Sequence, residues 1–113
     1  MAKASGNSNR IRDLNDAFRK TFHGGRVMLT QGIAALESDV QAMVIRKVAT
    51  FDTFTPDNDP HGEHDFGSFD LSGRKIFWKL DYYADARLEF GSDDPADPAK
   101  TCRVLTIMLA EEY

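Results

Sequence analysis

The chain of 113 residues is long enough for one hydrophobic core but too short for two ordinary domains. Hydrophobic residues make up 42% of it, which is typical of a packed globule, and its single cysteine excludes an intramolecular disulfide. No uncharged run approaches the ~20 residues of a membrane helix, and the first residues lack the apolar segment of a secretory signal. We therefore expect a cytoplasmic protein with no membrane contact.

The net charge of −4 is unevenly divided along the chain. Residues 1–56 contain eight Lys and Arg against five Asp and Glu, and residues 57–113 contain six against thirteen, so the halves carry +3 and −7. Nucleic-acid binding through the acidic half is not expected, because neutralising phosphates requires clustered Lys and Arg. The acidic half is either a solvated surface or a surface that meets another protein.

A flexible tail is predicted over residues 1–8, which are small and polar. Asn9 can cap a helix whose apolar residues recur every three or four positions and which ends at the pair Gly24 and Gly25. The apolar stripe consists of Ile11, Leu14, Phe18 and Phe22. Residues 26–31 are aliphatic and bounded by glycines, and this composition predicts a short strand.

A second helix is predicted to begin at Ser38, which has Gln41 three residues later and so matches a capping box. Its helical stripe of apolar residues predicts one buried face. That stripe consists of Val40, Met43, Val44, Val48 and Phe51. The helix is expected to end by Thr53, because Thr55 precedes a proline and is disfavoured in the helical conformation.

Residues 66–71 and 74–83 predict a β-hairpin around the turn Ser72-Gly73. With a two-residue loop, positions whose numbers sum to 145 face each other. Gly67 then lies beneath Trp78, and Asp70 faces Lys75. The face that carries Trp78 is expected to be the core face, with Ile76, Leu80 and Tyr82 beside it. Carried outward, the same register places His64 opposite Asp81.

The loop over residues 57–65 is rich in oxygen and nitrogen ligands, and His61, Glu63 and His64 could bind a divalent metal. Its start resembles a calcium loop, but the twelfth position, with Asp57 counted as the first, is Ser68 rather than the bidentate Glu. The histidines also lack the HExxH motif of zinc proteases. The alternative is a loop without cofactor, whose Asp and Asn side chains bond their own backbone.

The C-terminal part predicts a short strand over residues 87–90, then a loop over residues 91–100 with the acidic residues Asp93, Asp94 and Asp97. Residues 101–110 favour a strand buried on both faces, although Asp97 and Pro98 could also cap a helix there. The fold class is therefore α+β, with two helices packed on one face of a four- or five-stranded, mainly antiparallel sheet. Residues 9–113 form its single domain.

Several separated blocks, namely GEHDFGSF, FWKLDYY, SDDPADP, RVLTIMLAEEY and AFRKTFHGGRVMLT, resemble an uncharacterised bacterial family, domain of unknown function 3768. The resemblance covers almost the whole chain. It implies relatives carried by alphaproteobacterial plasmids and other mobile elements, and it supplies no activity or catalytic residues.

Two classes of function follow from these observations. The first is a small binding protein, for instance an inhibitor of a host defence system such as a restriction or CRISPR component, that contacts another protein and needs no cofactor. The second is a metal- or His/Asp-dependent enzyme, in which Asp81 would orient His64. The residues expected to form the binding surface or site are His61, Glu63, His64, Asp81, Tyr83, Asp93, Asp94 and Asp97.

Overall fold

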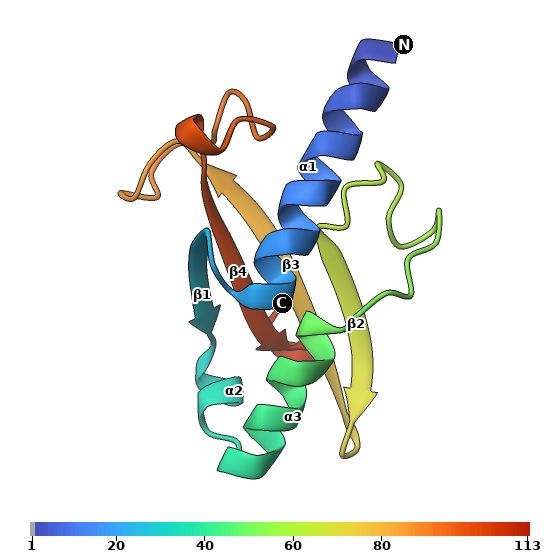
Figure 1. Cartoon of the computed structure of the whole chain (residues 1–113). Coiled ribbons are helices and arrows are strands. Elements are labelled where there is room, and N and C mark those ends of the chain that lie inside the picture. Colours follow the sequence, from blue (N-terminus) through green and yellow to red (C-terminus); the bar gives the residue numbers. More distant parts are fainter. Residues whose placement is uncertain (1) are drawn as a thin grey trace.

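A four-stranded sheet is the main element of the structure, a computed structural model that describes residues 2–113 (Figure 1). The strands lie in the order β1-β4-β3-β2, and they are β1 (Gly25–Leu29), β2 (Phe66–Leu71), β3 (Arg74–Tyr83) and β4 (Cys102–Leu109). β2, β3 and β4 are antiparallel neighbours, whereas β1 runs parallel to β4. The predicted strand over residues 101–110 is thus confirmed, and it is a central strand.

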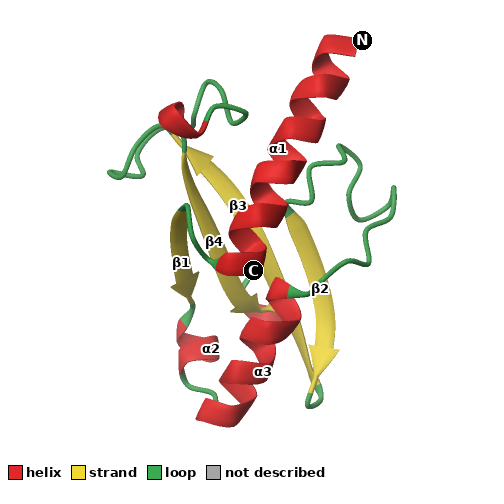
Figure 2. Cartoon of the chain, viewed as in Figure 1, coloured by secondary structure: helices red, strands yellow, loops and turns green. Residues whose placement is uncertain are grey.

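Three α-helices and two short 3-10 turns complete the fold of residues 2–113. They are α1 (Ala2–Thr21), α2 (Gln31–Ala34), α3 (Ser38–Ala49), η1 (Pro98–Lys100) and η2 (Ala110–Glu112). Figure 2 shows α1 and α3 on the same face of the mixed sheet, so the predicted α+β fold class is confirmed. None of the helices within residues 2–113 is long and apolar enough to cross a membrane.

The hydrophobic core lies between these helices and one face of the sheet. Phe18 of α1, Ile33 of α2 and Val48 of α3 are buried there against alternate residues of β3 and β4. Those strand residues are Ile76, Trp78, Leu80, Leu105, Ile107 and Leu109. Because side chains alternate along a strand, the residues between them point to the opposite face of the sheet.

The hairpin has the predicted register, and every β2–β3 pair sums to 145. Ser72 and Gly73 both have positive φ, 53° and 76°, as the tight two-residue turn requires. Asp70 and Lys75 pair across the strands, with 3.5 Å between Oδ1 and Nζ. Gly67 lies beneath Trp78, where a Cβ would come within 2.6 Å of Cε2 of the indole.

The first predicted helix start is wrong, whereas α3 begins at Ser38 as predicted but lacks the predicted capping box. α1 begins at Ala2 rather than at a cap on Asn9, so the predicted tail is helical from Ala2 onward, and Met1 lies outside the described residues. Alanine and lysine near this end favour the longer helix. α3 has no side-chain cap, because Gln41 donates to the carbonyl of Ile33 (3.1 Å) instead of closing a capping box with Ser38.

Two further differences concern the strands. The first predicted strand ends at Leu29, and the chain then forms the short helix α2. A helix of four residues is too short to show a helical period of apolar residues in the sequence. Residues 87–90 form a turn rather than a strand. The backbone N–H of Arg87 donates to the Asp85 carboxylate (2.9 Å), and Leu88 has a positive φ of 57°, so this segment cannot extend a ladder.

Candidate functional site

His64 points towards α1 and does not face Asp81, so the predicted pair is wrong. The hydrogen bonding between this loop and β3 begins one residue later, where the Leu80 N–H donates to the Asp65 carbonyl (2.8 Å). His64 itself has a φ of 55°, and this left-handed conformation turns its side chain out of the register. Asp81 instead pairs with Lys79, with 3.1 Å between Oδ2 and Nζ.

The imidazole of His64 lies between two carboxylates. Its Nδ1 is 2.9 Å from Oδ1 of Asp16 on α1, and its Nε2 is 3.6 Å from Oδ2 of Asp59 in the loop. The ring also stacks on Phe54, with 3.7 Å between centroids and 4° between planes. The hydrogen bond between Nδ1 and Asp16 ties the loop to α1.

The side chains of Asp59 and Asn58 hold the loop by hydrogen bonds to its backbone. Oδ1 of the buried Asp59 accepts from the backbone N–H groups of Glu63 and His64, both at 3.1 Å. The Asn58 side chain accepts from the Thr55 N–H (2.9 Å) and donates to the Thr53 carbonyl (3.0 Å). Asp and Asn side chains thus bond the loop's own backbone, as one of the two interpretations of this segment predicted.

The three proposed metal ligands point to different surroundings. His61 is exposed, Glu63 accepts from the Tyr82 hydroxyl (2.9 Å), and His64 faces Asp16 and Asp59. Within residues 2–113, no group of three or more His, Cys, Asp and Glu side chains is placed to hold a metal ion. His61 and His64 do line one open pocket of about 460 Å³, together with Phe54, Asp59 and Pro60.

A buried polar network connects this loop to the sheet. Asn15, fully buried on α1, donates to the Tyr82 hydroxyl (2.8 Å) and to the Glu63 carbonyl (3.0 Å). Its side-chain oxygen accepts from Nε of the buried Arg103 (2.8 Å), and Arg103 also donates to the Pro95 carbonyl. Every member thus has partners on distant segments, which fixes α1 against the end of the sheet.

Burial changes the ionisation of this network. Desolvation lowers the pKa of the Arg103 guanidinium and raises the pKa of the Tyr82 hydroxyl. Desolvation, and then the neighbouring Glu63 carboxylate, raise the pKa of Asp65. The surroundings of the Asp65 side chain therefore disfavour its charged, deprotonated form.

Arg19 links α1 to the end of α3. Its guanidinium is 1% exposed and donates to the carbonyl of Val48 in the last turn of that helix (2.7 Å) and to that of Phe51 just after it (2.8 Å). It also lies over the Trp78 ring, 4.9 Å from the centroid. A cation at a helix C-terminus is favoured by the helix dipole, so Arg19 acts as a cap supplied by another helix.

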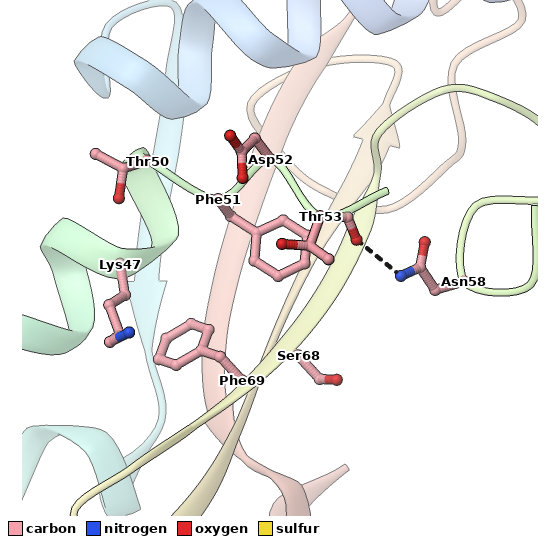
Figure 3. A pocket seen from close by; sticks show the side chains of 8 residues that line it. All are labelled: Lys47, Thr50, Phe51, Asp52, Thr53, Asn58, Ser68 and Phe69. Carbon is pink, nitrogen blue, oxygen red and sulfur yellow. Dashed lines mark hydrogen bonds between the residues drawn. The ribbon is translucent and has the colours of Figure 1, made fainter. Parts of the chain in front are cut away.

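A second pocket, of about 310 Å³, opens between the end of α3 and strand β2 (Figure 3). Phe51 and Phe69 form its apolar part, and the Lys47 ammonium lies 5.8 Å from the Phe69 centroid. Polar groups complete the lining, namely Thr50, Asp52, Thr53, Asn58 and Ser68. No prediction from the sequence pointed to this pocket, because its walls come from three separate segments.

The face of the sheet opposite the core, here called the open face, carries two of the predicted binding residues. Asp81 and Tyr83 lie on it in register with Val104 and Cys102 of β4. Phe66, Phe77 and Tyr113 form an aromatic cluster there, and the Tyr113 centroid is 5.5 Å from that of Phe77. Met28 of β1 adds an exposed apolar side chain, 49% accessible, beside Thr106.

The acidic residues of the 91–100 loop have different roles. Asp97 caps η1 by accepting from the Ala99 N–H (2.9 Å). The Asp94 carbonyl accepts from the Thr101 hydroxyl (2.9 Å), and Asp93 is exposed. Within residues 2–113, no hydrogen bond or ion pair joins the side chains of this loop to those of the 57–65 loop. The structure thus gives Asp97 a role as the cap of η1.

No curated protein and no solved structure matches the chain. A family model, described as a protein of unknown function, matches residues 29–112, which is well over half of the 113 residues. The match begins at the end of β1 and includes α2, α3 and strands β2 to β4. It leaves out α1 and also residues 17–28, which belong to the block AFRKTFHGGRVMLT that resembles the family. The chain therefore belongs to the DUF3768 family.

Proposed function

We propose that the chain is a small cytoplasmic protein that binds another protein through the open face of its sheet. The observation that carries the proposal is the one-sided packing. All three helices contribute to the core on one face, whereas the open face presents an aromatic cluster with the exposed Tyr113 and Met28. Aromatic residues and methionine are enriched at protein interfaces, where they bury apolar surface.

The charges on this face favour a protein over a nucleic acid. Lys79 is paired with Asp81, and Lys75 with Asp70. Arg26 of β1, in register with Val104, is then an isolated cation of this face rather than part of a basic cluster. Phosphate binding needs lysines and arginines whose charge is available. A partner with an apolar centre and polar rim fits this arrangement better.

The chain resembles a protein family whose members are carried by plasmids and other mobile elements, and this suggests a biological role for such binding. A mobile element gains from blocking a defence system of its host. A small protein can block such a system by covering the active or binding surface of a defence protein. We therefore propose an inhibitor of a host defence protein as the specific role.

Photo-crosslinking tests the proposal. A benzophenone amino acid at position 113 should form a defined adduct with a host protein in bacterial cells, and the same residue at position 90 should not. Position 90 is the matched control for position 113. Tyr113 and Phe90 are both exposed aromatic side chains, 76% and 70% accessible, but of these two Tyr113 packs on the open face.

The protein identified in this way is then purified and its binding measured directly. Tyr113→Asp should weaken binding at least ten-fold, and Phe90→Asp should leave it unchanged. Equal adducts from both positions, or equal affinities of both variants, would refute binding through the open face. If the identified protein belongs to a defence system, expression of the chain should raise plasmid transfer into that host, and Tyr113→Asp should remove the effect.

A further inference from the structure

The outer edge of β2 carries backbone groups without partners. β2 is the last strand of the sheet and pairs only with β3. Because Asp65 bonds to Leu80 and hydrogen-bonded pairs alternate in an antiparallel ladder, Gly67, Phe69 and Leu71 direct their N–H and C=O groups to β3. Phe66, Ser68 and Asp70 therefore direct theirs outward.

The pocket of about 310 Å³ adjoins this same edge. Ser68 and Phe69 of β2 line one side of it, and Lys47 and Thr50 at the end of α3 line the other (Figure 3). The pocket lies on the face that the helices cover. A strand added at the β2 edge would send every second side chain to that face, so one of them would enter the pocket.

The charge within the pocket selects the entering side chain. Among the described residues, Lys47 has no carboxylate within 4.0 Å, and its ammonium lies over the Phe69 ring. Asp52 also lines the pocket, but the carboxylate that pairs with the nearby buried Arg19 is that of Asp16, with 3.1 Å between Nη2 and Oδ1. Lys47 is thus the charged group of the pocket that lies against a side chain of β2, namely Phe69.

We propose that the β2 edge and this pocket form a docking site for an extended peptide segment that carries a glutamate or aspartate side chain. The backbone of the segment pairs with Phe66, Ser68 and Asp70, and its carboxylate reaches Lys47. The proposal rests on the proposed protein-binding function but concerns a separate surface, so each can fail without the other.

Peptide binding to the full chain provides the test. The probes are eight-residue peptides of alternating threonine and valine with glutamate at the fourth position, and the same peptides with glutamine or lysine there. Binding of the glutamate peptide should slow hydrogen exchange at the amides of Phe66, Ser68 and Asp70, which are unpaired in the free protein. The amide of Phe69, which already bonds to β3, serves as the internal reference.

The affinity should fall from the glutamate to the glutamine peptide by about five-fold, the upper range for an exposed ion pair, and further for the lysine peptide. Lys47→Gln should abolish this order of preference. Lys75→Gln, which removes a lysine that is paired with Asp70 on the open face, should preserve it.

A proline at position 68 provides the sharpest variant. Ser68→Pro removes an outward N–H without breaking a bond to β3, and edge strands tolerate proline at such positions. The folded variant should lose peptide binding. The proposal is overturned if no peptide slows exchange at the three amides at 1 mM, if folded Ser68→Pro binds as wild type does, or if Lys47→Gln keeps the preference for glutamate. Photo-crosslinking at position 113 is independent of all three results.

Discussion

Replacement of Gly67 by alanine should destabilise the protein through Trp78. An alanine Cβ would lie 2.6 Å from Cε2 of the indole and closer still to Nε1, whereas ordinary contacts begin at 3.4 Å, so the ring or the strand must move by about 1 Å. The ring cannot withdraw easily, because Trp78 is 0% exposed and packs against Phe51, with 5.5 Å between centroids, and against Arg19. Gly67 does not have a positive φ, so the close approach alone accounts for the effect.

The magnitude follows from two opposing terms. Overpacking of this kind costs about 1–3 kcal/mol. The alanine also restricts the unfolded chain and returns about 0.4–1 kcal/mol. We expect the free energy of unfolding to fall by about 1–2 kcal/mol, which for a domain near 100 residues lowers Tm by about 4–8 °C.

Urea unfolding followed by the fluorescence of Trp78, the single tryptophan of the chain, measures this change. Gly91→Ala is the matched control, because its Cβ would meet nothing closer than the Tyr82 carbonyl oxygen at 3.7 Å. That variant should stay within about 0.5 kcal/mol of wild type. If both variants unfold at the same urea concentration, the indole does not restrict position 67 and the reasoning is wrong.

Two further predictions concern pH. Hydrogen bonds from Thr30 and from the N–H groups of Leu109 and Gly32 lower the pKa of Glu112, so its stabilisation is present above the ordinary value of 4.5 and is lost as the pH falls through the lower value in the folded state. The Tm of Glu112→Gln should thus lie below that of wild type at pH 7, and the gap should close as the pH falls through the lowered pKa of Glu112; a constant gap would contradict this assignment. The raised pKa of Asp65 means that its charge costs stability above the folded value, so Asp65→Asn should be more stable than wild type at pH 7 and equal to it below the ordinary value of 3.8. Thermal unfolding by circular dichroism at stepped pH measures both, and a less stable Asp65→Asn at pH 7 would show that the carboxylate has a favourable role.

The parts of the fold that depend on neighbouring residues could be predicted from the sequence. The hairpin register follows from the turn at Ser72-Gly73 and the alternation around it, and both act over a few residues. The central strand β4 follows from its β-branched and aliphatic residues. Its parallel pairing with β1 could not be predicted, because nothing local to residues 25–29 encodes a partner such as Arg103.

The polar residues of the site show the limit of local reasoning most clearly. Asn15, Arg19 and Arg103 look like surface residues in the sequence, but each is buried. The Asn15–Arg103 bond joins positions 88 residues apart, so neither residue carries a signal of its own burial. Asn15 lies one position after Leu14 of the apolar stripe, and that position is the one signal that could have marked it. A single residue in the left-handed conformation, His64, was enough to replace the predicted partner Asp81 by Asp16.

β4 is the last strand of the sheet to leave the ribosome during synthesis, although it lies between β1 and β3. Until residues 102–109 emerge, β1 has no neighbour, and the β2–β3 hairpin exposes the edge of β3 that β4 will occupy. Closure of the sheet joins Gly25 to Arg103 and is therefore a slow, long-range step. Nascent chains with exposed strand edges pair readily with one another. Chaperones that cover such edges should therefore raise the yield of this protein more than that of an equally long chain whose adjacent strands follow one another in sequence.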